Sequence, residues 1–173
     1  MTRALRPVVI LLAAWTFVLA PVPLAALGQR PSPTHRIVAV RVFAPRRDAG
    51  TNCARVYALR RVVAAPAVLT GALHALLAGP TAAERRRGYA GWFSTRTARS
   101  LRGVRLSHGV TYVDFRDFRR VIPNASSSCG SALLLAQLDR TVTQFASVTR
   151  AVYSFDGDRR AFYEWLQREA PSS

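Results

Sequence analysis

The segment "LLAGPTAAERRRGYAGWFS", residues 76–94, brings together residue types that can do chemistry. Thr81 and Glu84 carry the hydroxyl and the carboxylate of a nucleophile and its base. The same spacing is that of a capping box, in which Thr81 begins a short helix and Glu84 reaches back to it. Gly79 is suited to end the preceding helix in a left-handed conformation, and Pro80 prevents its continuation. We therefore interpret Thr81 and Glu84 as structural residues that start a helix and not as a reaction centre.

A basic and aromatic cluster follows this capping box. Guanidinium groups bind anions, and aromatic rings stack on sugars or on the side chains of a partner. The alternative is a solvated run of charge followed by aromatic residues packed beneath a sheet. The candidate partner-binding patch, which we call the arginine patch, comprises Arg85, Arg86, Arg87, Tyr89, Trp92 and Phe93.

Two cysteines, Cys53 and Cys129, offer a second kind of chemistry. In an exported protein an even pair favours a disulfide, and a bridge closing so long a loop would add roughly 4 kcal/mol of stability. The rival hypothesis is that Cys129 is a nucleophile, because it lies at a predicted helix start, where the helix dipole lowers a thiol pKa. That enzyme would need His74 or His108 as its base, and the fold would have to bring the pair together.

Other catalytic or ligand-binding patterns are missing from the sequence. His35, His74 and His108 lack the paired spacing of metal ligands, and we predict neither a metal nor a cofactor. Asp114 and Asp117 follow one hairpin, so they do not form a pair of carboxylates facing each other across a cleft. No glycine-rich phosphate loop is present. The sequence therefore predicts a binding module and not an enzyme.

The N-terminal residues and the charge predict where this module works. Arg3 and Arg6 precede an uncharged apolar run over residues 8–20, and small residues then lead to Gly28. This is typical of a signal peptide over 1–28, cleaved near Gly28; the alternative is an uncleaved membrane anchor. The formal net charge of +16 comes entirely from arginine and would attract the protein to anionic wall polymers or membrane surfaces. Because we expect an extracytoplasmic location, we expect no nucleic-acid partner.

Hydrophobic periodicity predicts an α/β fold after a Pro-rich linker over 29–35. We expect an almost continuously apolar strand over 36–44, buried on both faces, and a second strand over 54–64 nearer an edge. A helix over 66–78, beginning at Pro66, would follow. The remaining predicted elements are a hairpin over 101–118 that turns at His108 and Gly109, a helix after the serines at 126–128, a strand over 148–155 and a short closing helix.

The predicted order is β-β-α-β-β-α-β-α. Strands alternating with two long amphipathic helices predict a single two-layer α/β (α+β) sandwich. We expect a mixed sheet of about four or five strands, with both main helices on one face. The predicted domain covers 36–157, and a C-terminal helix and tail cover 158–173.

Three segments, in order along the chain, resemble the GerMN domain, the sporulation and spore-germination module of exported bacterial proteins. "ALLAGPTAAERRRG" is similar to the family's LLxGPTxxExxxG segment, and "LRGVRLSHGVTYVDF" is similar to its hairpin. "LLLAQLDRTVTQFASVTRAVYSFDG" is similar to the helix and strand that follow. The residues that fall on the structural motif include Gly79, Pro80, Thr81, Glu84, Gly88, Gly109, Asp114 and Phe115.

The resemblance implies an α/β sandwich, export, and service as a binding or assembly module. It supplies no catalytic residue, because none is established for the family. The partner it implies is an envelope protein or a second copy of the chain, with a possible link to sporulation, germination or an envelope sensor system. Cys53 and Cys129 are not part of the motif.

Overall fold

The computed structural model describes residues 36–48 and 50–171. The predicted signal peptide or anchor over 1–28 and the linker over 29–35 lie outside the described residues. Within them, no helix has the length and apolar character needed to cross a membrane. The elements are of mixed α and β type and follow one another in the predicted order, with a short helix and a 3-10 turn added.

The first two strands form a hairpin-like sheet of their own. β1 (Ile37–Ala44) pairs antiparallel with β2 (Tyr57–Ala64), and Ala39 lies opposite Val62. Val40, Val42 and Ala44 are buried, whereas the residues between them face outward. The prediction that this strand is buried on both faces was therefore wrong, because only one face of the two-stranded sheet is covered by helices.

The other three strands form a second sheet in the order β3-β4-β5. β3 (Leu101–Ser107) and β4 (Val110–Phe115) are antiparallel, and β4 is parallel to β5 (Arg150–Phe155). The turn between β3 and β4 lies at His108 and Gly109, as the sequence predicted, and both residues have positive φ. The parallel pair is joined by a helical crossover, which such a pair requires.

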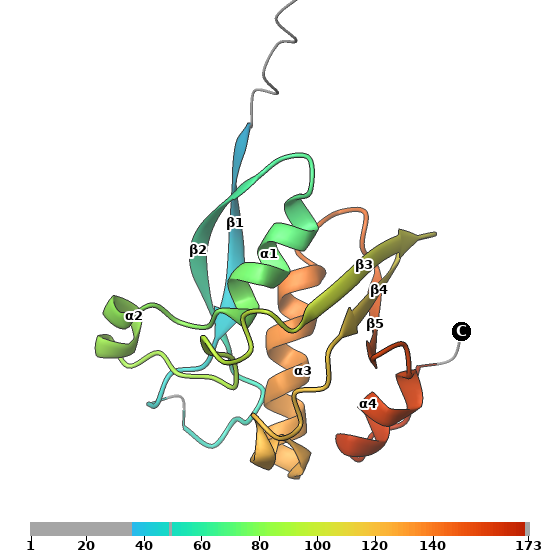
Figure 1. Ribbon diagram of the computed structural model, residues 1–173. Helices are drawn as coiled ribbons and strands as arrows, with labels where there is room; N and C mark the ends of the chain where they lie inside the picture. The colour runs from blue at the N-terminus through green and yellow to red at the C-terminus, as the bar shows by residue number, and fades with distance from the viewer. Residues whose placement is uncertain (1–35, 49, 172–173) are drawn as a thin grey trace, which may run out of the picture. The chain divides into compact units, whose positions relative to one another are not determined.

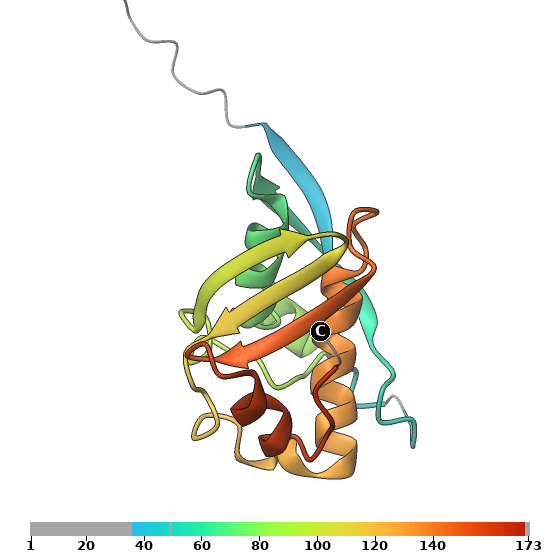
Figure 2. The same ribbon diagram turned by 90° about the vertical axis from the view of Figure 1, so that its right-hand side faces the viewer.

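Two helices separate the sheets. α1 (Val68–Leu77) and α3 (Ser128–Val142) pack against each other and contact β1, and each also contacts a strand of the second sheet. Figures 1 and 2 show both helices between the β1-β2 pair and the β3-β4-β5 sheet. The α/β class is confirmed, but the strands divide between two sheets instead of forming one. α1 begins two residues after Pro66, its predicted first residue.

Three further short helices complete the described part of the chain. α2 (Ala82–Arg86) follows α1 directly, η1 (Pro123–Ser126) precedes α3, and α4 (Arg159–Trp165) packs on β5. Most of the core is a single apolar cluster rich in aromatic rings. Phe118, for example, makes edge contacts with Phe93, Phe115 and Phe155. α4 adds Phe162 and Trp165 to the same cluster.

Gly79 lies where α1 ends and the chain turns toward α2. Its φ is +72°, a left-handed conformation, and its N–H donates to the carbonyl of Leu76 at 2.9 Å. The backbone of Phe93 passes so close that a Cβ at position 79 would overlap the Phe93 carbonyl. The hydroxyl of buried Thr97 donates to the carbonyl of Leu77 at 2.7 Å, which satisfies a group at the end of α1. The 88–97 loop is thereby fixed to the end of α1.

We predict that Gly79→Ala is markedly more destabilising than Gly157→Ala. Gly157 also has positive φ (+86°) but has open space around it, so its substitution costs only the backbone strain, about 1 kcal/mol. Gly79→Ala adds steric overlap, for which we expect roughly 2 kcal/mol more. Urea denaturation of the two variants measures the difference. Equal losses would show that the close approach to Phe93 does not matter.

Candidate functional site

Thr81 and Glu84 form the capping box that the sequence predicts. The N–H of Glu84 donates to Thr81 Oγ1 at 3.2 Å, and the N–H of Thr81 donates to Glu84 Oε2 at 2.7 Å. Thr81 itself is extended, as an N-cap residue is, and α2 begins at the next position. Both side chains therefore satisfy backbone groups at a helix start.

Glu84 also forms the most buried ion pair among the described residues. Arg61 on β2 donates through both of its terminal nitrogens to the two carboxylate oxygens, each at 2.7 Å. The side chains are 15% and 8% exposed. The hydrogen bond from Arg61 is the main reason that the pKa of Glu84 falls from 4.5 to about 2, although burial opposes the shift. A carboxylate held in this way is a poor general base at neutral pH.

Asp114 of the motif and Gln137, which lies in the third family-like segment, are also hydrogen-bonded to other elements. Asp114 Oδ1 accepts from the hydroxyl of Ser154 at 2.7 Å and from the N–H of Gly157 at 2.8 Å. Arg102 pairs with the other carboxylate oxygen of Asp114 at 2.9 Å.

Gln137 is buried, with 1% of its surface exposed. It donates to the carbonyl of Phe43 at 3.2 Å and accepts from the N–H of Trp92 at 3.3 Å. These contacts join separate elements, so the polar side chains involved have structural roles.

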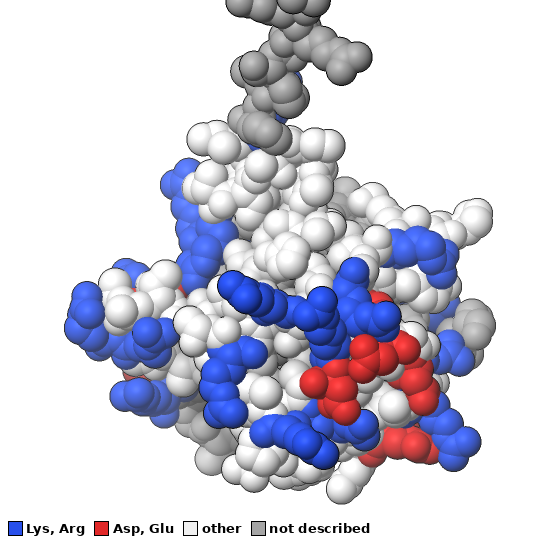
Figure 3. Space-filling view, viewed as in Figure 1, with Lys and Arg blue, Asp and Glu red and all other residues white. Residues whose placement is uncertain are grey.

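The structure separates the arginine patch into two parts. Arg85, Arg86 and Arg87 are exposed on α2 and at its end, and Figure 3 shows basic side chains gathered over this helix. Phe93 is only 2% exposed and packs in the core, so a partner cannot contact its ring. The indole N–H of half-buried Trp92 donates to the carbonyl of Gly130 at 3.2 Å. The three arginines are thus the accessible part of the patch.

Tyr89 remains at the border of this surface. It is half-buried, and the guanidinium of Arg46 lies over its ring at 5.6 Å from the centroid. Arg46 and Tyr89 also form an isolated β-bridge, and the N–H of neighbouring Arg47 donates to the carbonyl of Gly88 at 3.0 Å. The loop after β1 therefore brings two more arginines beside α2.

The cysteines are joined. Cys53, in the loop before β2, forms a disulfide with Cys129 in the first turn of α3. The bridge ties that loop to the helix. No free cysteine remains within the described residues. The thiol that the alternative enzyme hypothesis requires is thus oxidised in this structure, and His74 and His108 lie on α1 and in the β3-β4 turn.

Sequence reasoning missed one buried polar pair. The hydroxyl of Tyr153 on β5 donates to Asp139 Oδ1 on α3 at 2.7 Å. Burial raises the pKa of Asp139 and raises the pKa of Tyr153 well above its usual value, so the tyrosine stays protonated at neutral pH. Tyr153 was expected only as a strand residue, because the pairing partner lies on a separate element. Within the described residues, no group of three or more His, Cys, Asp or Glu side chains is placed to hold a metal ion.

Comparison with known proteins identifies the family. The family model described as "Germane: Sporulation and spore germination" matches residues 41–160, most of the chain. The chain therefore belongs to this GerMN-type family of sporulation and germination domains. Among solved structures, the first GerMN domain of the sporulation protein GerM from Bacillus subtilis is similar, with 17% sequence identity and a TM-score of 0.49. That match covers 79% of this chain and 94% of the other. No curated protein matches the chain.

We predict that Glu84→Gln destabilises the protein at neutral pH but less so in acid. Glutamine preserves the capping box and removes the charge that Arg61 binds. Because the folded-state pKa is depressed from 4.5 to about 2, this stabilisation is present above pH 4.5 and is lost as the pH falls toward 2. At one pKa unit per 1.36 kcal/mol, the shift corresponds to roughly 3 kcal/mol as an upper value.

Urea denaturation of the wild type and the variant at several pH values tests this prediction. The matched control is Glu164→Gln, which removes a solvent-exposed pair with Arg160 and should lower the stability far less than Glu84→Gln does. A gap between wild type and Glu84→Gln that stays the same from pH 7 to pH 2 would contradict the assignment.

Proposed function

We propose that this chain is an exported, non-catalytic binding and assembly module of the bacterial cell envelope. Membership of the sporulation and germination family supports this role. So do the apolar run over 8–20 and the small residues before Gly28, which have the pattern of an export signal. The description of this family supports a role in sporulation or germination, and an envelope sensor system is the other setting that we propose.

The observation that carries the proposal is how the family motif is used. Its polar side chains cap a helix, pair with arginine or bind backbone groups, as Thr81, Glu84 and Asp114 illustrate. The motif thus builds a hydrogen-bonded segment in which α2 and its C-terminal end carry exposed arginines. A conformationally fixed basic surface suits recognition of a partner better than chemistry on a substrate.

Anionic wall polymers or membrane surfaces are a second candidate ligand class. The exposed arginines on α2 favour it, because guanidinium groups bind phosphate and carboxylate groups in a bidentate manner. Such binding would weaken steeply as salt screens the charges. Binding to a folded protein partner would depend more on the geometry of the patch and less on salt.

Export predicts a defined N-terminus. We expect the protein recovered from the envelope or the medium to begin near residue 29, as measured by mass spectrometry of the intact chain. Deletion of residues 8–20 should leave it in the cytoplasm with its N-terminal segment uncleaved. An intact wild-type chain in the membrane fraction would indicate the anchor instead. An intact chain confined to the cytoplasm would refute export.

The arginine patch is tested by removing its charge. We expect Arg85→Ser, Arg86→Ser and Arg87→Ser together to reduce capture of envelope components from extract at least fivefold, because binding energy concentrates in a few arginine contacts. The matched control changes Arg96, Arg116 and Arg120 to Ser, three exposed arginines elsewhere. Equal losses in both triple variants would show that only net charge matters and would reject the patch.

A further inference from the structure

The free edge of β1 is closed over only part of its length. The amide of Gln144, just beyond α3, accepts from the N–H of Arg41 at 2.9 Å and donates to the Arg41 carbonyl at 2.6 Å. Gln137 donates to the carbonyl of Phe43 in the same way. These side-chain amides replace the hydrogen bonds of a missing neighbouring strand. The edge is thus satisfied at Arg41 and at the Phe43 carbonyl.

Toward the start of the strand the edge stays open. Because backbone groups alternate in direction along a strand, those of Ala39 point to the same side as those of Arg41. Within the described residues, no hydrogen bond reaches the backbone of Ala39 from outside the β1-β2 pair. Ala39 is exposed. A short stretch of edge strand therefore offers an unpaired donor and acceptor.

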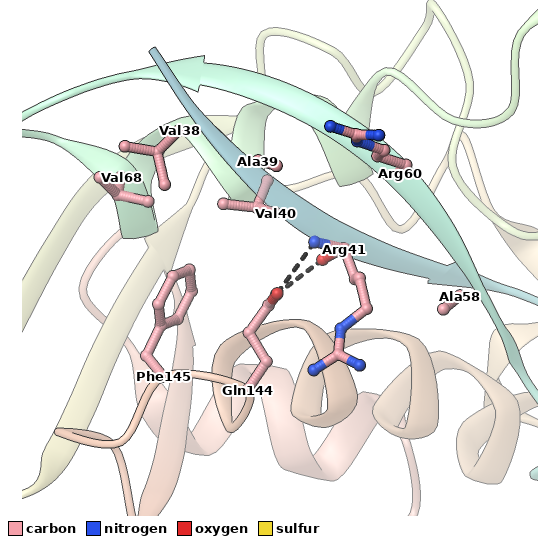
Figure 4. A pocket seen from close by; sticks show the side chains of 9 residues that line it. All are labelled: Val38, Ala39, Val40, Arg41, Ala58, Arg60, Val68, Gln144 and Phe145. Atoms are coloured by element: carbon pink, nitrogen blue, oxygen red, sulfur yellow. Dashed lines mark hydrogen bonds between the residues drawn. The ribbon is translucent and has the colours of Figure 1, made fainter. Parts of the chain in front are cut away.

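A hollow of about 750 Å³ lies at this open edge. Val38, Val40, Val68 and Phe145 give it apolar walls, and Figure 4 shows Val38, Val68 and Phe145 gathered on one side of β1. Two exposed apolar side chains, Ile37 at 72% and Val62 at 59%, lie nearby on β1 and β2. Exposed apolar side chains around a hollow and an open strand edge are features of a surface that receives another chain.

The positive charge of the hollow favours an acidic ligand. Arg41 and Arg60 line it, and no acidic residue does. Neither guanidinium forms an ion pair with a carboxylate among the described residues. A second copy of the chain would bring its own arginines to the same place and be repelled. An extended segment with alternating apolar and acidic side chains complements the apolar walls, the backbone edge and the charge together.

The β3 edge of the other sheet lacks these features. β3 is also an edge strand, but its pairing with β4 is irregular between Leu101 and Gly103. Its exposed face carries Arg102 and Arg105, and Arg102 is already paired with Asp114 and Asp156. A bulged edge with charged side chains resists strand addition. Strand addition is therefore favoured at the β1 edge over the β3 edge.

We propose that the β1 edge at Ala39 binds an extended acidic-apolar segment of a partner protein by strand addition. This inference rests on the proposed binding role and names the chemistry of the partner. Backbone hydrogen bonds at Ala39 supply the pairing, Val38, Val68 and Phe145 receive an apolar side chain, and Arg41 and Arg60 bind carboxylates.

The probe for the test is a fluorescein-labelled seven-residue peptide of alternating Glu and Val with blocked ends, added to the purified full chain. Fluorescence anisotropy should report binding to the wild type. Ala39→Pro removes the outward N–H, which an edge strand tolerates, and should weaken binding at least tenfold. The matched control, Ala64→Pro, alters an exposed residue of β2 whose N–H points away from β1, and it should change binding less than twofold.

Two further arms separate strand addition from attraction to positive charge. N-methylation of alternate peptide bonds should abolish binding, and replacement of Glu by Lys should do the same. Arg41→Glu with Arg60→Glu should reverse the preference between the Glu and Lys peptides, whereas Arg96→Glu with Arg116→Glu should not. This pair of variants keeps the test decisive if Ala39→Pro fails to fold.

Three outcomes would overturn the proposal: equal binding to Ala39→Pro and the wild type, equal binding of the N-methylated peptide, or binding only to vesicles of anionic phospholipid. The last would assign the hollow to a membrane surface. Export and capture through α2 are measured independently of this peptide. Failure of the strand-addition proposal therefore leaves the envelope role intact, and failure of export leaves peptide binding intact.

Discussion

The structure depends on how the backbone of a two-stranded sheet is satisfied. A pair of strands has two free edges, and it is not stable in water without further packing. Here β1 gains that packing from α1 and α3, and the amides of Gln137 and Gln144 stand in for a third strand. Gln137 lies on α3 and Gln144 lies two residues beyond its end. Because seven residues make about two helical turns, both side chains face β1. α3 is thus both the core of the domain and the partner of one sheet edge.

The same helix connects the remaining elements. Gln137 also accepts from the N–H of Trp92, Asp139 binds the hydroxyl of Tyr153, and Cys129 holds the loop before β2. One side of α3 therefore holds the first sheet, while Asp139 bonds to the second. Because the bridged cysteines are 76 residues apart, the disulfide restricts the unfolded chain and adds roughly 4 kcal/mol in the entropic account. The motif loop around α2 is then held from both ends, by Glu84 to β2 and by Trp92 to α3.

Local signals in the sequence predicted the local structure. Thr81 and Glu84 form their capping box, Gly79 takes the left-handed conformation, and the β3-β4 turn falls at His108 and Gly109. Each of these depends on residues within four positions of one another. The division into two sheets depends on which distant strands pair, and hydrophobic periodicity carries no such information. Phe93 was a candidate for the arginine patch, with packing beneath a sheet as the alternative. The loop passes close to Gly79 and buries the Phe93 ring, so the alternative holds for this residue.

The few acidic residues compensate part of the positive charge of this basic domain, and their positions decide where positive charge stays uncompensated. Six of them form ion pairs with arginine, Asp158 caps α4 through the N–H of Ala161, and Asp139 binds Tyr153. Figure 3 shows acidic side chains grouped near the connection from β5 to α4, away from α2. Positive charge is therefore balanced where the chain turns and left unbalanced on α2 and at the β1 edge. The ion pair between Arg61 and Glu84 joins β2 to α2, so the two basic surfaces lie on elements that are fixed to each other.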